Sequence, residues 1–291
     1  MKYTKLITAG ALVAGLWPGL AQAQVSRVFV SVNGNDLNDC LQPTSACRTL
    51  NGGIAKVDTN GEVIVIDTGS FAGASVTKGV KINVPSGAIA FSASSVVVNA
   101  PGATVVIRGL TLKAFTPGSG KGIDIQAAAV VMVENCVIDG WETGIDVVAN
   151  NVRVDVKDST VRNSDFIGLW QHAAGSLVTV DQSRFERSGD SGARSDNGTM
   201  SVTRSFFAGN NWGVGTNAAA GTVNVSRSTV SGNTNGGAFS FNGTTRIAES
   251  NITANGVGLQ HGSGTLESFK DNILHANTSD TSGTITAVTR Q

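Results

Sequence analysis

Apolar and polar residues alternate in a short pattern, V-x-V-x-x-S-x-(V/F/I), that recurs along most of the chain. Such alternation is typical of a strand with one buried face. Successive copies begin 21 to 26 residues apart, at positions 105, 131, 154, 178, 200, 223, 245 and 266. A repeat of this length predicts a solenoid in which each coil stacks on the one before.

A second alternating segment follows each copy and begins with glycine. We call the strands predicted here the Gly ladder, and they begin at Gly122, Gly144, Gly168, Gly192, Gly213, Gly237 and Gly256. Three short strands and three turns fit one repeat, and coils stacked about 4.8 Å apart can hydrogen-bond to each other. The sequence therefore predicts an all-β fold, a single-stranded right-handed parallel β-helix of about ten coils over residues 63–291, with an N-terminal helical cap.

The serine of the pattern recurs in the same place in consecutive coils, at Ser159, Ser183, Ser205, Ser228 and Ser250. We expect these side chains to stack at one turn, where their hydroxyls can bond along the column. Cys136 occupies the same column and is similar to serine in size. We therefore expect it to be a buried structural thiol and no nucleophile.

The first 23 residues have the pattern of an export signal. Lys2 and Lys5 precede an apolar stretch too short to span a bilayer, and Ala21-Gln22-Ala23 is a cleavage signature. The mature chain would begin at Gln24 and be secreted or periplasmic. No later segment predicts a transmembrane helix.

Residues 24–62 are predicted to hold an N-terminal strand, a disulfide loop and a capping helix. Cys40 and Cys47 are close together in a turn-rich stretch of an exported chain, which favours a disulfide between them. Residues 48–57 carry apolar side chains at helical spacing. A helix there would cover the open strand edge at the end of the solenoid.

Charge and composition narrow the classes of partner. Charged residues make up 14% of the chain, and without Lys2 and Lys5 there remain 19 basic against 21 acidic residues. This balance argues against nucleic acid and against docking on anionic lipid. The arginines near the turns, Arg184, Arg187, Arg204 and Arg227, have acidic neighbours in sequence and predict a salt-bridged surface. We expect a monomer.

Two segments resemble known β-helix proteins. Val105 to Leu112 is similar to the strand–turn–strand segment of pectate-lyase-type coils, and Val28 to Asp36 with Cys47-Arg48-Thr49 resembles the opening of exported bacterial β-helix proteins. The mature chain thus resembles the pectin-lyase-like superfamily over nearly all its length. The resemblance implies that the outer face of the Gly ladder holds a polysaccharide. An R-x-P-x-x-R segment is missing, and only His261-Gly262 matches a polygalacturonase signature, so a standard pectinase is not expected.

Outward side chains on the Gly ladder are the candidates for chemistry. Two residues after each glycine come Asp124, Asp146, Trp170, Arg194, Gly215, Phe239 and Gly258. Four residues after it come Gln126, Val148, His172, Asp196, Asn217, Phe241 and Gln260. Every coil exposes some side chains, so the alternative is an ordinary solvated surface.

Asp124 and Asp146 are predicted to lie one coil apart, roughly 5 Å. Carboxylates that close either share a proton, which gives a catalytic acid and base, or bind a cation such as calcium. His172 is a further candidate catalyst. Asp196 is a candidate substrate-binding residue, and it could also orient His172. Trp170 could stack on a sugar ring, and Arg194 could pair with a uronate carboxylate.

Two functional hypotheses follow. In the first, the protein binds a polysaccharide or cell-surface glycan on the Gly ladder and could cleave it as a lyase or a glycoside hydrolase. In the second, it is a non-catalytic exported solenoid that serves as a surface, adhesion or envelope interaction module. Both predict that the fold tolerates Asp124→Ala and Asp146→Ala, because outward residues contribute little to the core.

Overall fold

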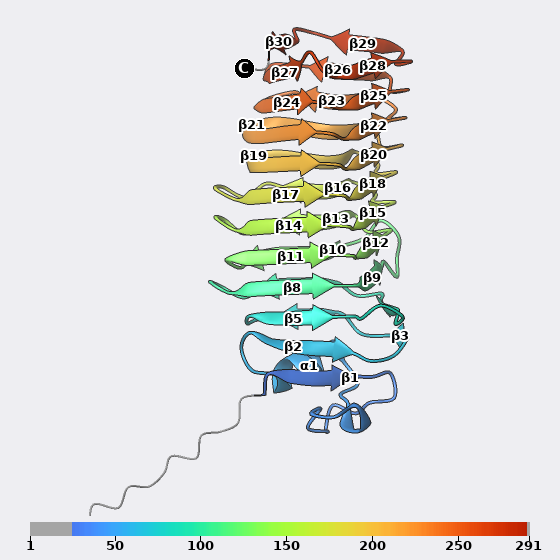
Figure 1. Cartoon of the computed structure of the whole chain (residues 1–291), viewed down its shortest axis with the longest axis vertical. Coiled ribbons are helices and arrows are strands. Elements are labelled where there is room, and N and C mark those ends of the chain that lie inside the picture. Colours follow the sequence, from blue (N-terminus) through green and yellow to red (C-terminus); the bar gives the residue numbers. More distant parts are fainter. Residues whose placement is uncertain (1–24, 290–291) are drawn as a thin grey trace, which may run out of the picture.

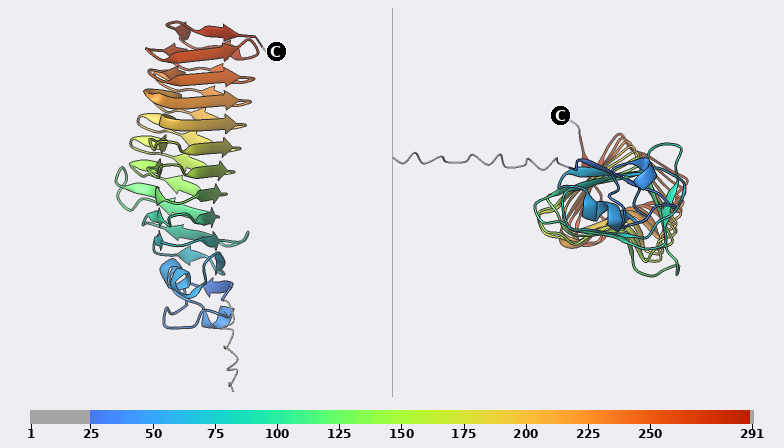
Figure 2. Two further views of the ribbon diagram at one scale, coloured as in Figure 1. Left: turned by 90° about the vertical axis from the view of Figure 1, so that its left-hand side faces the viewer. Right: turned by 90° about the horizontal axis from the view of Figure 1, so that it is seen from below.

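The chain folds into a straight solenoid of stacked coils (Figure 1). The computed structural model describes residues 25–289. In this range the strands pair in parallel, each with its counterparts one coil before and one coil after. Seen along the axis, the coils superpose around one interior (Figure 2). The predicted parallel β-helix of about ten coils with little helix is confirmed.

Each coil contributes a strand to each of three ladders. The Gly ladder comprises β4 Ala74–Val76, β7 Val96–Asn99, β10 Lys121–Ala127, β13 Thr143–Val147, β16 Ile167–Gln171, the first halves of β19 Ser191–Thr203 and β21 Trp212–Ser226, then β23 Gly236–Ser240, β26 Val257–His261 and β29 Ser279–Ser282.

The V-x-V segments form a second ladder, which we call the Val ladder. It comprises β1 Arg27–Val30, β2 Gly61–Val65, β5 Val80–Asn83, β8 Thr104–Arg108, β11 Val130–Glu134, β14 Arg153–Lys157, β17 Leu177–Asp181, the second halves of β19 and β21, β24 Thr244–Ala248, β27 Thr265–Phe269 and β30 Thr286–Val288.

The third ladder follows the serine of the pattern. It comprises β3 Gly69–Ser70, β6 Ala90–Ser92, β9 Leu110–Lys113, β12 Val137–Asp139, β15 Thr160–Arg162, β18 Arg184–Glu186, β20 Phe206–Ala208, β22 Thr229–Ser231, β25 Asn251–Thr253 and β28 Ile273–His275.

The register of the Gly ladder is as predicted except in the last repeat. Asp124 pairs with Asp146, and Trp170, Arg194, Gly215 and Phe239 follow in the same row. The next residue in this row is Gln260, so the predictions that Gly258 follows Phe239 and that Gln260 follows Phe241 were wrong by two residues. Gly256 lies in the turn, where its N–H donates to the carbonyl of Asn233, and does not begin the strand.

Inward side chains of the three ladders form one continuous core, made mainly of valine, isoleucine and alanine. Phe185 and Phe207 stack in it with ring centroids 5.2 Å apart. Cys136 is buried as predicted, and burial raises the pKa of its thiol to about 11. Because a neutral thiol is a poor nucleophile and metal ligand, Cys136 has a structural role.

The N-terminal end is closed by a helix and a disulfide loop. Helix α1, Leu50–Lys56, begins after Thr49, whose hydroxyl accepts a hydrogen bond from the N–H of Gly52. The predicted disulfide between Cys40 and Cys47 is present. Strand β1 pairs with β2, so the Val ladder already includes the N-terminal strand. The predicted export signal, 1–23, lies outside the described residues.

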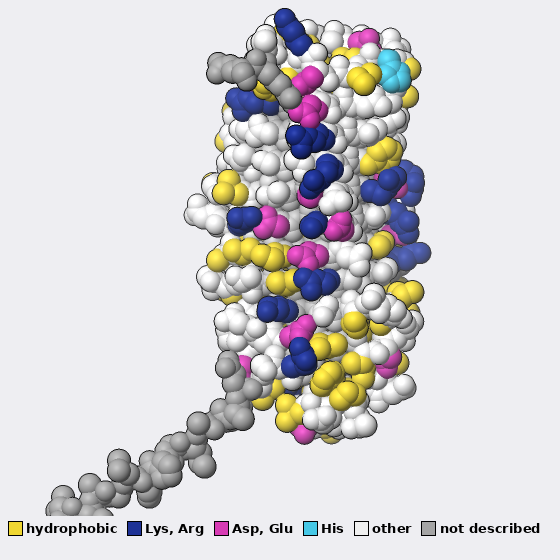
Figure 3. Space-filling model, viewed as in Figure 1, with side chains coloured by type: hydrophobic (Ala, Val, Ile, Leu, Met, Phe, Trp, Pro, Cys, Tyr) yellow, Lys and Arg dark blue, Asp and Glu magenta, His cyan; other side chains and the backbone are white. Residues whose placement is uncertain are grey.

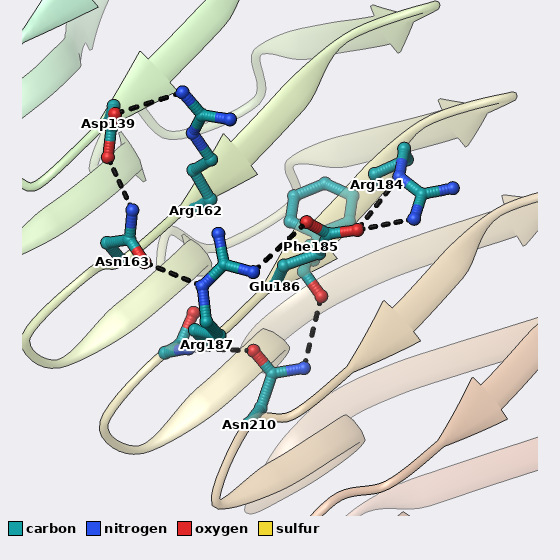
Figure 4. A network of polar contacts seen from close by, with 9 residues as sticks. Asp139, Arg162, Asn163, Arg184, Phe185, Glu186, Arg187 and Asn210 are labelled. Atoms are coloured by element: carbon teal, nitrogen blue, oxygen red, sulfur yellow. Dashed lines mark hydrogen bonds and ion pairs between the residues drawn. The ribbon is translucent and has the colours of Figure 1, made fainter.

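The surface charges are largely paired, as predicted for the arginines near the turns. Arg184 and Arg187 contact Glu186, Arg204 contacts Asp181, and Arg227 contacts Glu249; Figure 4 shows the network around Arg187 and Asn210. On the Val ladder, basic and acidic side chains alternate along the axis (Figure 3), and among them are the pairs Arg108–Glu134 and Arg246–Glu267. This surface is a salt-bridged one without a concentration of positive charge.

Two polar columns run through the buried turns. From Cys136 to Ser228, the backbone N–H of each column residue donates to the hydroxyl of the serine one coil later, and the N–H of Ser250 donates to Asn272 Oδ1. Asparagines form a second column, which the sequence analysis missed: Asn210, Asn233, Asn255 and Asn277. The side chains of the first three bond to the coils on both sides, whereas that of Asn277 bonds to the preceding coil and to Asp280. These bonds fix the register of the turns.

Replacing one buried member of this column should be costly. Asn233→Ala removes the acceptor of two N–H groups of Asn210 and the donor to the carbonyl of Phe207, leaving buried polar groups unpaired. We expect a loss of about 2–4 kcal/mol in the free energy of unfolding. Asn235→Ala, at an exposed position nearby, should change it by less than about 0.5 kcal/mol. Urea unfolding of the two variants measures the difference, and equal stabilities would contradict a structural column.

Candidate functional site

Lys121 lies between the two predicted aspartates at the start of β10. Its ammonium forms an ion pair with Asp146, and it is 3.6 Å from a carboxylate oxygen of Asp124. The other oxygen of Asp124 accepts a hydrogen bond from the side-chain amide of Gln126 at 2.8 Å. The two neighbouring carboxylates are therefore bridged by a cation that the protein itself supplies.

Asp146 is buried, contrary to its predicted exposure. Its side chain is 1% exposed because Lys121 covers one carboxylate oxygen and His172 covers the other. The Nε2 atom of His172 is 2.7 Å from Asp146 Oδ1. The prediction that Asp196 orients His172 was wrong, since Asp146, one coil earlier, holds this position.

Burial and hydrogen bonding have opposite effects on Asp146. Burial alone raises the pKa of the carboxyl group, but the hydrogen bonds from His172 and Lys121 outweigh it and hold the pKa below its usual value of 3.8. For Lys121, burial alone lowers the pKa of the ammonium. The hydrogen bond to Asp146 and the charge of this carboxylate outweigh burial and hold the pKa above its usual value of 10.5. Asp146 and Lys121 are therefore both ionised near neutral pH.

Trp170 and His172 extend the site along β16. Their rings stack with centroids 4.2 Å apart and planes 17° from parallel, and both side chains are half-buried. The indole N–H of Trp170 donates to Asp196 at 2.7 Å. Phe166 meets the indole edge-on, with centroids 5.5 Å apart. The indole is thus fixed in orientation on the outer face of the Gly ladder.

Arg194 follows Trp170 one coil further along, but its charge is already compensated. Its two terminal nitrogens contact Asp190 at 3.1 Å and Asp196 at 3.0 Å, and only 9% of its side chain is exposed. The Nε atom has no hydrogen-bond partner among the described residues. Arg194 was predicted to pair with a uronate carboxylate. In the structure, two aspartates already occupy its guanidinium, so a uronate would have to displace one of them.

A small hollow of about 130 Å³ adjoins Arg194. It is lined by Asp190, Ser191, Arg194, Trp212, Asn217, Phe239 and Phe241. Trp212 packs against both phenylalanines, with centroids 4.8 Å from Phe241 and 5.6 Å from Phe239. A larger and mostly apolar hollow of about 340 Å³ lies elsewhere, on the outer face of the Val ladder between Ser201 and Phe269. It contains one charged side chain, Arg246, and lies away from the groups described above.

The predicted residues lie on neighbouring coils of one face: Asp124, Asp146, Trp170, His172, Arg194 and Asp196. Three further residues of the site were not predicted from the sequence: Lys121, Asp190 and Trp212. These three residues lie at the starts of β10, β19 and β21, next to the turn that leads into the Gly ladder. Counting outward positions only after each glycine passed over them. Lys121 and Trp212 come directly before a glycine, at a position that strict alternation does not assign to the outer face, whereas counting two residues back from Gly192 would have found Asp190.

The calcium ion predicted between Asp124 and Asp146 gains no third carboxylate, histidine or cysteine ligand from the described residues. Residues 25–289 contain no cluster of three or more histidine, cysteine, aspartate or glutamate side chains that could hold a metal ion. The ammonium of Lys121 already occupies the position between the carboxylates. A calcium requirement thus stays a prediction, without support from the arrangement of ligands.

The fold is a parallel β-helix with a polar outer face on the Gly ladder. The family model of NosD, described as periplasmic copper-binding protein, matches residues 97–288. The chain belongs to the NosD family. A comparison with curated protein sequences gave no match. In the described residues there is no helix long and apolar enough to cross a membrane.

A comparison with solved structures gave matches at low sequence identity, and the first of them shows the same fold. The pectate lyase Pel9A is 14% identical with a TM-score of 0.51, and the match covers 93% of this chain and 80% of the lyase. The A-module of the mannuronan C-5 epimerase AlgE4 from Azotobacter vinelandii is 11% identical with a TM-score of 0.45, covering 79% of this chain and 91% of the module. An alginate lyase from Paenibacillus sp. str. FPU-7 is 11% identical with a TM-score of 0.44, covering 89% and 99%.

The side chains of the described part do not assemble a copper site. Copper favours histidine, cysteine and methionine ligands. His172 is bound to Asp146, His261 contacts the carbonyl of Gly264, and His275 contacts Thr253. Cys136 and Met200 are buried, and the other two cysteines form the disulfide. Met132 is half-buried and lines a hollow on the Val ladder whose lining contains no histidine or cysteine. The family's description therefore does not extend to a copper site in this part of the chain.

The burial of Asp146 changes what its replacement should do. Asp146→Ala leaves Lys121 and His172 without their partner and should cost about 1–3 kcal/mol in the free energy of unfolding. Asp124→Ala should cost less than about 1 kcal/mol, because its contacts are a longer ion pair and one amide. Thermal unfolding at pH 7 compares them.

The pH dependence follows from the lowered pKa of Asp146. A carboxyl group whose pKa is lower in the folded state stabilises the fold above its unfolded pKa and loses this effect as the pH falls through the folded pKa. The stability difference between the wild type and Asp146→Ala should therefore shrink below about pH 4. A difference that stays constant from pH 7 to pH 3 would contradict the ion pair.

Proposed function

We propose that this protein binds a polysaccharide on the outer face of the Gly ladder, between Lys121 and Phe241, and that it does so in the periplasm. The family's description and the predicted export signal support the location. The observation that carries the proposal is the row of outward groups on successive coils: carboxylates, an imidazole, two indoles and a guanidinium. The spacing of about 4.8 Å between coils is close to the length of one sugar unit in a chain.

The chemistry of this row suits a carbohydrate. Aromatic side chains offer flat apolar surfaces for the faces of sugar rings, and fixed polar groups can bond to hydroxyls. Trp170 is held by Asp196, Phe166 and His172, so little conformational freedom is lost on binding. A solvated surface would not require such mutual fixation. The regularity of the solenoid supports the alternative function, an envelope interaction module that binds no glycan.

Cleavage is a second candidate activity, favoured by the His172–Asp146 contact. A half-buried imidazole held at 2.7 Å by a buried carboxylate has the arrangement of a general base whose orientation a carboxylate fixes. His172 would remove or donate the proton, Asp146 would position it, and Lys121 would keep Asp146 ionised. Asp124 is not in contact with His172 in the structure, so its predicted catalytic role depends on a bound substrate.

A binding and turnover screen of residues 24–291 tests the proposal. Trp170→Ala should weaken binding about tenfold or more, since it removes a preformed stacking surface. The matched control is Phe206→Ala, which removes a half-buried aromatic ring from the outer face of the third ladder and should leave affinity unchanged. His172→Ala should abolish any turnover. If no acidic or neutral glycan binds, the interaction-module function becomes the better account.

A further inference from the structure

The hollow beside Arg194 has aromatic walls that pack directly against backbone. A Cβ atom on Gly236 would lie 2.5 Å from the indole of Trp212, and one on Gly215 would lie 2.8 Å from the ring of Phe239. The two rings therefore rest directly on glycine backbone, which no larger residue would allow. Phe241 closes the cluster with its ring centroid 5.2 Å from that of Phe239.

Arg194 and Asp190 form part of the polar wall of the hollow. The Arg194 side chain is more than nine-tenths buried, and its two terminal nitrogens are held by Asp190 and Asp196. The guanidinium is therefore fixed in position and already neutralised. Asn217 and Ser191 add further polar groups to the same wall. An aromatic surface opposite hydrogen-bond donors and acceptors is suited to a sugar ring.

The formal charge of the whole row identifies the class of sugar. Lys121 and Arg194 bring two positive charges, whereas Asp124, Asp146, Asp190 and Asp196 bring four negative ones. Each cation is already in contact with two carboxylates. A uronate would have to displace an aspartate from a buried guanidinium, or approach an excess of negative charge, and both are unfavourable.

We infer that the hollow formed by Trp212, Phe241, Asn217 and Arg194 binds an uncharged sugar unit, and that the Gly ladder selects neutral glycans over uronates. This inference rests on the proposed function, because it specifies the ligand of the same face. The sugar ring lies against the exposed side of Trp212 and Phe241, its oxygens accept from the side-chain amide of Asn217, and its hydroxyls donate to Asp190. The neighbouring units extend over Trp170 toward His172.

Affinity measurements with two groups of probes test the inference. Neutral probes are xyloglucan, galactomannan and mixed-linkage β-glucan, and acidic probes are polygalacturonate and alginate. We expect at least one neutral probe to bind, and both acidic probes to bind at least tenfold more weakly. Trp212→Ala should reduce the affinity for the neutral probe at least tenfold, whereas Phe206→Ala should not change it. Circular dichroism and the Tm of each variant show that it is folded.

A charge variant provides a second, independent readout. Asp190→Asn retains the size of the side chain but removes one of the two charges that neutralise Arg194. It should raise the affinity for polygalacturonate relative to the wild type, without an equal gain for the neutral probe.

The outcomes are distinguishable. Tighter binding of acidic than of neutral probes, or neutral binding that Trp212→Ala leaves intact, would overturn this inference while the proposed function stands. If neither group binds, the proposed function itself fails.

Discussion

The stacking of every coil in register on its neighbours is the constraint on which the remaining structure depends. Parallel hydrogen bonding places each side chain next to its counterpart one repeat away, so one outward position becomes a row along the whole molecule. The buried serine and asparagine columns reinforce this register by bonding the turns to each other. The core, the salt-bridged Val ladder and the candidate site are consequences of the same arrangement.

The repeat made most of this fold predictable. Alternation located the strands, and the glycine that begins most Gly-ladder strands placed Asp146 beside Trp170, as the strand register confirms. The register was wrong only after Gly256, where the length of a turn changes and the position of a glycine no longer marks the start of the strand. Periodicity defines positions that are related by translation, and a turn of different length breaks that relation.

The site was less predictable, for a physical reason. Alternation shows which way a side chain leaves the strand, but not which long side chain folds back over it. Lys121, at the start of the adjacent strand, contacts one carboxylate oxygen of Asp146 and helps to bury it. His172 contacts the other oxygen, an interaction that the spacing of the residues did not predict. Arg194 is outward as predicted, but its charge is neutralised by Asp190, in the turn before its strand, and by Asp196, on the strand itself. These contacts decide the charge of the face, and hence the ligand it favours.

The central claim is that the Gly ladder is the surface that meets a glycan, and three indoles allow it to be tested directly. Residues 24–291 contain Trp141, Trp170 and Trp212, and Trp141 is buried with its N–H bonded to the carbonyl of Leu112. Indole N–H resonances of residues 24–291 can be followed by NMR during titration with neutral and acidic oligosaccharides. We predict that the Trp170 and Trp212 resonances move with a neutral oligosaccharide while that of Trp141 remains in place. Binding that leaves both outer indoles unaffected would contradict the account.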